Sequence, residues 1–156
     1  MAHTLIFTAT LSCATIAGVF FAFSAFVMNG LSQLPPAQGI AAMQSINISA
    51  VRPKFMIALF GTAAMCVTLV IRGFLIWGER PAGFLVAGGG IYLVGTILLT
   101  IGYHVPLNNG LASTQPNSAE ATIPWAAYLT HWTRWNHVRA AAALVASLMF
   151  GLALTT

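Results

Sequence analysis

Residues 83–105 read GFLVAGGGIYLVGTILLTIGYHV and contain no Asp, Glu, Lys or Arg. A helix needs about 20 consecutive apolar residues to cross the hydrocarbon core of a bilayer, so this stretch predicts a membrane-spanning helix. Three more apolar stretches of similar length lie at residues 4–28, 54–76 and 137–156. The sequence therefore predicts an all-α integral membrane protein, a four-helix bundle whose spans form a single domain over residues 1–156.

The composition agrees with a membrane protein and excludes a soluble one. Of the 156 residues, 58% are hydrophobic and 5% are charged, whereas a soluble domain carries about 25% charged residues. The net charge of +4 comes from six Lys and Arg residues that form no basic cluster. We therefore expect the lipid bilayer as a partner and no binding to nucleic acid.

The first apolar stretch, residues 4–28, has the apolar character of a signal peptide. No Lys or Arg precedes it, and its apolar run is longer than the central region of a typical signal peptide. We therefore expect a retained helix.

Small residues recur on one face of each predicted span. They are Ala14, Gly18 and Ala22 in the first, Ala58, Thr62 and Cys66 in the second, Gly88, Gly95 and Gly102 in the third, and Ala143, Ser147 and Gly151 in the fourth. Helices in lipid associate through close backbone contact, so these faces predict the packing seams of the bundle. Small faces that point outward could join copies of the chain, so a homo-oligomer stays open and the sequence does not fix the oligomeric state.

Proline residues divide the connections between the spans into helices and turns. Pro36 opens an apolar-periodic stretch that runs to about Ala50, which predicts a short helix in the membrane interface. Residues 78–82 form a tight turn, so the second and third spans are expected to be neighbours. Pro106 is expected to end the third helix. The fourth helix is expected to begin near Ile123 and to project from the bilayer as an extended helix.

Nearly all polar side chains fall in the first and third connections, which four crossings place on the same side of the bilayer. Lys and Arg are also more frequent there, with Arg52, Lys54, Arg134 and Arg139 against Arg72 and Arg80 on the other side. The positive-inside tendency therefore predicts that the first and third connections are cytoplasmic.

The densest polar segment, residues 131–139, reads HWTRWNHVR. On a helix, His131, Trp135 and Arg139 share one face, and Arg134 and His137 lie on a neighbouring face. One interpretation is an interfacial belt, in which Trp settles among the lipid head groups and Arg anchors beside it. The other is a functional site, because two His, two Arg and one Asn are packed together.

Two shorter polar segments would meet this one at the same side of the bilayer. Residues 103–109 read YHVPLNN, where His104 is either an interfacial residue or a general base, since histidine exchanges protons near neutral pH. In the first connection, Asn47 would either bind a substrate oxygen or cap the short helix.

We expect no metal site. His131 and His137 are six residues apart and point to nearly opposite faces of one helix. The acidic residues Glu79 and Glu120 both lie in connections, whereas metal-binding bundles place carboxylates and His at helical spacing within their helices.

Four segments resemble the domain-of-unknown-function family 1772, also described as anthrone-oxygenase-like. They are GVFFAFS at residues 18–24, MQSIN at 43–47, VPLN at 105–108 and WTRWNHVR at 132–139. The resemblance covers essentially the whole chain and implies a small four-span protein of mostly bacterial membranes, so we expect the bacterial inner membrane. A fungal branch is associated with oxidising anthrones to anthraquinones. His104 stands where members often have asparagine, which implies a different substrate or a base that other members supply elsewhere.

The resemblance further implies an oxygenase that acts on a lipophilic aromatic molecule of anthrone or quinol type, with dioxygen as co-substrate. Such a reaction needs no cofactor in principle, while a flavin or quinone stays open. His104 or His131 would be the base, and Arg134 and Arg139 would stabilise the oxyanion. The substrate-binding residues would be Asn47, Arg52, Tyr103, Asn108, Trp132, Trp135, Asn136 and His137.

Two functions without chemistry stay open beside the oxygenase. The same residues could form a binding or transport module for a small hydrophobic molecule, or the aromatic helix could dock a protein partner as an accessory subunit. Transporters often contain internal repeats and broken helices, and the four spans show no obvious repeat.

Overall fold

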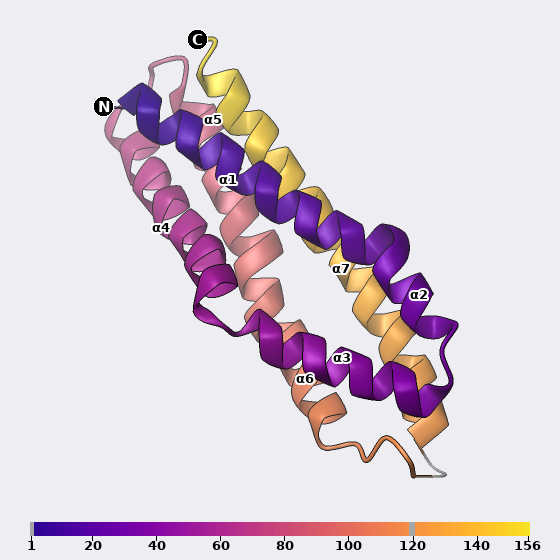
Figure 1. Cartoon of the computed structure of the whole chain (residues 1–156). Helices are drawn as coiled ribbons and strands as arrows, with labels where there is room; N and C mark the ends of the chain where they lie inside the picture. The colour runs from indigo at the N-terminus through magenta and orange to yellow at the C-terminus, as the bar shows by residue number, and fades with distance from the viewer. Residues whose placement is uncertain (1, 119–120) are drawn as a thin grey trace.

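The computed structural model, which describes residues 2–118 and 121–156, is a bundle of long helices (Figure 1). Four helices are long and apolar enough to cross a membrane, namely Ala2–Ser32, Pro53–Leu75, Ala82–Ala112 and Thr122–Ala153. The described part of the chain contains no strand. The prediction of an all-α membrane bundle is therefore confirmed.

Wide π-helical turns interrupt the first and third of these long helices. The first consists of α1 (Ala2–Ala22), the π-turn η1 (Phe23–Val27) and α2 (Met28–Ser32). The third consists of α5 (Ala82–Tyr92), η2 (Leu93–Leu98), η3 (Thr100–His104) and α6 (Val105–Ala112). The second and fourth are the uninterrupted helices α4 (Pro53–Leu75) and α7 (Thr122–Ala153).

The first and third connections lie together at one end of the bundle. Figure 1 shows α2, α3 and α6 at this end and both chain termini beside the α4–α5 connection at the other. The short helix α3 (Pro36–Ala50) contacts α2, α6 and α7. Glu120, a carboxylate of the third connection, lies outside the described residues.

The prediction that Pro106 ends the third helix is wrong. The helix continues through α6, and Pro106 occupies its first turn. A proline lacks the N–H that an α-helix needs, and its ring crowds the carbonyl group four residues earlier. The π-turn η3 comes directly before it and widens the backbone there, so the ring is accommodated. The helix therefore carries Asn108 beyond the predicted span.

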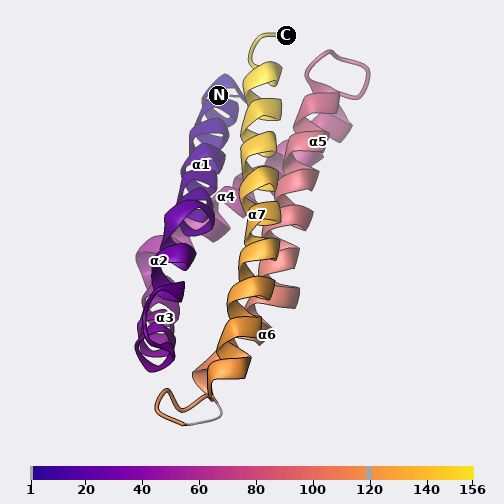
Figure 2. The same cartoon turned by 90° about the vertical axis from the view of Figure 1, so that its right-hand side faces the viewer.

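Small residues let the third long helix pack closely on α7, which lies between α1 and α5 (Figure 2). A Cβ added at Gly88 would lie 3.0 Å from a ring carbon of Phe150, and one at Gly95 would lie 2.5 Å from Cβ of Ala142. A larger residue at Gly95 would therefore displace α7, and one at Gly88 would crowd the Phe150 ring. Two of the predicted glycines therefore do mark a seam.

The small face predicted for the first helix is wrong. Ala14 and Gly18 are exposed, whereas Cys13 and Ala17 are buried in the bundle core. Small residues occupy adjoining columns of this helix, and their spacing alone does not decide which column turns inward.

We expect Gly89→Ala to destabilise the seam between α4 and α5. The added Cβ would lie 2.5 Å from Cγ2 of Val70 and 2.8 Å from the backbone oxygen of Cys66. Overpacking of this kind costs about 1–3 kcal/mol, so the thermal unfolding midpoint in detergent should fall. Gly90→Ala is the matched control, because no atom lies within 4 Å of its added Cβ. Equal midpoints for the two variants would contradict the prediction.

A second apolar core, which we call the end cluster, lies where the first and third connections meet. Its buried members are Met28, Leu31, Ile40, Met43, Leu111, Ala121, Trp125, Tyr128 and Trp132. These residues come from α2, α3, α6, α7 and the residue before α7. The end cluster therefore fastens α3 across this end of the bundle.

Candidate functional site

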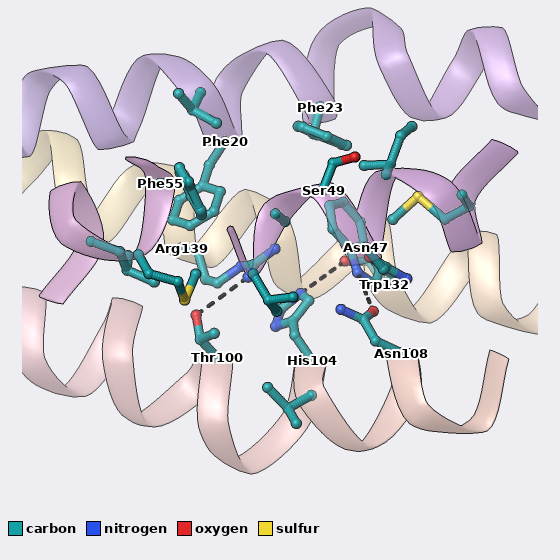
Figure 3. Close-up of a pocket in the computed structure, with 18 of the residues that line it drawn as sticks. Phe20, Phe23, Asn47, Ser49, Phe55, Thr100, His104, Asn108, Trp132 and Arg139 are labelled. Atoms are coloured by element: carbon teal, nitrogen blue, oxygen red, sulfur yellow. Dashed lines mark hydrogen bonds between the residues drawn. The ribbon is translucent and has the colours of Figure 1, made fainter. Parts of the chain in front are cut away.

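A cavity of about 560 Å³ lies between the end cluster and the bundle core (Figure 3). Its wall contains Phe20 and Phe23 of the first helix, Asn47 and Ser49 of α3, Phe55 of α4, Thr100, His104 and Asn108 of the third helix, and Trp132 and Arg139 of α7. Most of the wall is apolar, and a few polar groups converge on it. This combination is the usual form of a small-molecule site.

Arg139 places a positive charge in the cavity wall, and its side chain is only 4% exposed. Its Nη1 donates to Oγ1 of Thr100 (3.3 Å), and its Nη2 donates to Oδ1 of Asn136 (2.7 Å). Its Cζ lies 4.2 Å from the ring centroid of Phe20 and 5.1 Å from that of Trp132. Two aromatic faces therefore stabilise the buried cation.

No carboxylate neutralises this guanidinium within residues 2–118 and 121–156. Glu79, the acidic residue in that part of the chain, is exposed in the α4–α5 connection at the opposite end. The buried Nε of Arg139 has no hydrogen-bond partner there either. A buried charge is costly unless it is paired, so the wall at Arg139 is suited to a negatively charged oxygen of a ligand.

Asn136 positions the guanidinium of Arg139 by accepting a hydrogen bond from it. Its Nδ2 donates to the carbonyl oxygen of Phe20 (2.7 Å) and to Oγ of Ser24 (2.8 Å). Because both amide hydrogens are used, its Oδ1 faces Arg139. The π-turn η1 begins at Phe23, and backbone carbonyl groups beside such a turn become available to side-chain donors. The local backbone of α1 thus positions the arginine of α7.

His104 is buried in the part of the wall that the third long helix forms, with 1% of its surface exposed. Its Nδ1 lies 3.4 Å from the carbonyl oxygen of Leu99, and its Nε2 lies 3.3 Å from that of Trp132. A neutral imidazole donates to only one of these oxygens, whereas a protonated ring donates to both. The ring also packs edge to face on Trp132 at 5.3 Å between centroids. Both ring nitrogens of His104 therefore lie against main-chain carbonyl oxygens, and these contacts together with Trp132 hold the ring in one plane.

Two amide side chains complete the wall beside α3. Oδ1 of Asn108 accepts hydrogen bonds from Oη of Tyr128 (2.8 Å) and Nε1 of Trp132 (3.1 Å). Nδ2 of Asn47 lies 3.5 Å from the same tyrosine oxygen. These bonds link α3, α6 and α7 and fix the indole ring of Trp132 as a flat wall of the cavity.

The sequence model of one known family, described as anthrone oxygenase, matches residues 54–149. The match covers more than half of the chain. The chain belongs to the anthrone oxygenase family. The resemblance found in the sequence is thereby confirmed. No curated protein and no solved structure matches the chain.

The segment that matches the anthrone oxygenase family supplies only part of the cavity wall. His104 and Arg139 lie inside the matched range, together with Asn136. Phe20 and Asn47 precede it. Arg139 and His104 therefore come from the family segment, and α1 and α3 add the aromatic and amide groups that enclose them.

The structure brings several of the residues predicted for the site into this one cavity. Asn47, His104, Asn108, Trp132 and Arg139 line it. Asn136 contacts Arg139 from behind. These residues come from three separate segments, and the packing of α3, α7 and the third long helix brings them together.

The remaining predicted residues lie outside the cavity. Arg52, His131, Arg134, Trp135 and His137 are exposed, and none of them lines it. Tyr103 is half-buried against Trp135, with 5.3 Å between ring centroids, and faces a separate groove that it shares with His131. His137 borders an outer groove between α1 and α7.

Sequence reasoning missed the aromatic and hydroxyl groups that lie inside the spans. Phe20, Phe23, Phe55 and Thr100 line the cavity. One signal was present, because Thr100 lies four residues before His104 and so shares its helix face. The phenylalanines gave no such signal, because apolar aromatic residues in a span are equally expected to face lipid.

Proposed function

We propose that this membrane protein is an oxygenase that converts a flat, lipophilic molecule of anthrone or quinol type in the cavity, with dioxygen as co-substrate and no bound cofactor. The observation that carries the proposal is the buried guanidinium of Arg139, which has no carboxylate partner among the described residues and faces an aromatic cavity. Membership of the anthrone oxygenase family supports it.

The chemistry of an anthrone needs few protein groups. Loss of a proton from the ring CH2 opposite the carbonyl group gives an aromatic anion with its charge on the oxygen. This anion transfers electrons to dioxygen, a C–O bond forms at the same carbon, and a proton completes a hydroperoxide. Loss of water then leaves a second carbonyl group. One atom of dioxygen enters the product and the other leaves as water, so the reaction needs no other reductant.

The described residues can supply the three functions that this reaction requires. Arg139 would stabilise the negative oxygen, since a preorganised cation in a site without water acts most strongly on developing charge. His104 would accept the proton of the CH2 group, because it is the histidine that lines the cavity. Phe23, Phe55 and Trp132 would contact the faces and edges of the rings.

Oxidation of an anthrone by the purified protein tests the proposal. The protein in lipid nanodiscs would be mixed with 1,8-dihydroxyanthrone while oxygen uptake and anthraquinone absorbance are recorded. We expect a rate far above that of empty nanodiscs and one dioxygen consumed for each quinone formed. A rate equal to that of empty nanodiscs would refute the oxygenase. Tight retention of the anthrone without turnover would instead favour a non-catalytic binding module.

The end of the bundle that carries the cavity is proposed to face the cytoplasm of a bacterial inner membrane. Its exposed cations are Arg52, Lys54 and Arg134, against Arg72 and Arg80 at the other end. The positive-inside tendency favours the richer end. Alkaline phosphatase fused after Thr156 should therefore be active, because this enzyme folds only outside the cytoplasm and the C-terminus lies at the far end (Figure 1). An inactive phosphatase fusion together with a fluorescent cytoplasmic-reporter fusion would reverse the orientation.

A further inference from the structure

The residues that line the cavity differ sharply in exposure, and this difference locates its mouth. The polar floor is buried, with Arg139 at 4% and His104 at 1% exposure. Four apolar lining residues are exposed, namely Val51 (68%), Phe60 (48%), Ile101 (51%) and Val105 (43%), and the lining residues Ser45 and Ser49 of α3 are exposed as well. A side chain that borders a cavity and is also about half exposed stands at its rim. We call these four residues the apolar rim.

The apolar rim lies where two helices separate. α4 packs along α5 and η2, whereas α6 packs on α3 and α7. Phe60 stands on the α4 side, and Ile101 and Val105 stand on the η3 and α6 side. The seam between the second and third long helices therefore opens toward this end of the bundle, and the cavity lies behind the opening.

The opening lies at the depth of lipid acyl chains. Phe60 is seven residues beyond Pro53, where α4 begins, and a rise of 1.5 Å per residue places it about 10 Å along the helix. Ile101 is 19 residues beyond Ala82, the start of α5, which is about 28 Å. The hydrocarbon core is about 30 Å thick, so Phe60 and Ile101 face its outer part, and Val51 and Val105 stand nearer the head groups.

The water-facing end of the bundle is closed by packed side chains. Ile40 and Met43 of α3 are fully buried in the end cluster. A Cβ added at Gly39 would lie 2.8 Å from the ring of Trp125, so no space is left between α3 and α7 there. Nε2 of Gln44 donates to the carbonyl oxygens of Leu111 and Thr114, both at 2.9 Å. α3 is thereby held across the end of the cavity.

We infer that the cavity exchanges its occupant with the interior of the bilayer, through a lateral portal bordered by the apolar rim. The inference rests on the proposed function and narrows its substrate class to neutral, planar molecules that dissolve in lipid. An anion does not dissolve in hydrocarbon. The substrate therefore arrives protonated and loses its proton only beside Arg139.

Narrowing the portal tests this route. The probe is 1,8-dihydroxyanthraquinone, a planar coloured molecule that cannot undergo the oxidation and whose visible absorbance changes when it leaves the lipid for a site beside a cation. Protein in vesicles is mixed with vesicles that contain the probe, and the slow phase of this absorbance change is followed. We expect Ile101→Trp and Val105→Trp to slow association and dissociation alike, by about tenfold, with an unchanged Kd, because a narrowed passage does not alter the bound state.

Two further variants make the result specific. Leu98→Trp adds a tryptophan one helical turn away, at a residue that is 60% exposed and does not line the cavity, and it should leave both rates unchanged. Ser49→Trp narrows the exposed α3 side of the cavity. Slow exchange in Ser49→Trp but not in the rim variants would overturn the portal in favour of loading from the head groups. Wild-type rates in all variants would also overturn it.

The outcome is separable from that of the proposed function. Slow probe exchange in the rim variants of a protein that does not oxidise anthrones would support the portal and refute the oxygenase. Wild-type probe exchange in both rim variants of a protein that oxidises anthrones would refute the portal and support the oxygenase. A wild-type protein that takes up no probe would refute both.

Discussion

Replacing Arg139 with glutamine is expected to lower kcat for anthrone oxidation by about 100- to 1,000-fold, the range found when one preorganised oxyanion-stabilising group is removed. Glutamine retains hydrogen-bonding capacity toward Thr100 and Asn136 but removes the positive charge. The charge matters here because the described residues offer no other cation in the cavity wall. Initial rates of quinone formation at saturating anthrone measure the effect.

Arg134→Gln is the matched control for this prediction. Arg134 lies on the same helix, five residues away, but is exposed and outside the cavity. We expect its kcat to stay within about twofold of wild type, because exposed charges are screened by solvent. Arg139→Lys should recover only part of the activity, since an ammonium group keeps the charge but lacks the planar fork of a guanidinium. Equal rates for Arg139→Gln and Arg134→Gln would refute the assigned role.

His104→Ala is expected to lower kcat by about 100- to 10,000-fold, the usual contribution of a general base. The substitution removes the group that accepts the proton and leaves a space the size of an imidazole ring between Leu99 and Trp132. Added imidazole should therefore restore a substantial part of the rate in a concentration-dependent manner. Such rescue distinguishes proton transfer from a purely structural role, which a small molecule in solution would not restore.

His131→Ala is the matched control for His104→Ala. His131→Ala removes an exposed histidine that does not line the cavity, so we expect neither a large loss of activity nor a response to imidazole. Loss of activity in His104→Ala without rescue, together with a lower unfolding midpoint, would assign His104 to the fold. A wild-type rate in His104→Ala would remove it from the mechanism.

The fold was predictable because the bilayer imposes simple rules on the sequence. Each span needs enough apolar residues to cross the hydrocarbon core, and backbone groups must be satisfied within the helix. These rules are visible at residues 83–105 without any structure. They do not predict where a helix stops once it leaves the lipid, which is why the continuation through Pro106 was missed.

The candidate site was predictable only in part, for a geometric reason. The helical repeat shows that His131, Trp135 and Arg139 lie on the same side of α7. It does not show that only Arg139 of these three lines the cavity. Burial decides this point, and burial depends on where α1 and α3 are placed. The aromatic cover over Arg139 comes from Phe20, more than 100 residues earlier in the chain, and no local pattern connects the two.

The wide turns within the first and third long helices have a consequence for how this protein tolerates change. Part of the framework that orients Arg139 and His104 is main chain, through the oxygens of Phe20, Leu99 and Trp132. Side-chain substitution does not erase a main-chain acceptor, so many residues around the cavity can vary while this framework persists. Deleting one residue from either wide turn is different. It would convert the turn to regular helix, in which the helix's own N–H groups use the carbonyl oxygens, so a single lost codon would disturb this main-chain framework more than most replacements of the cavity wall.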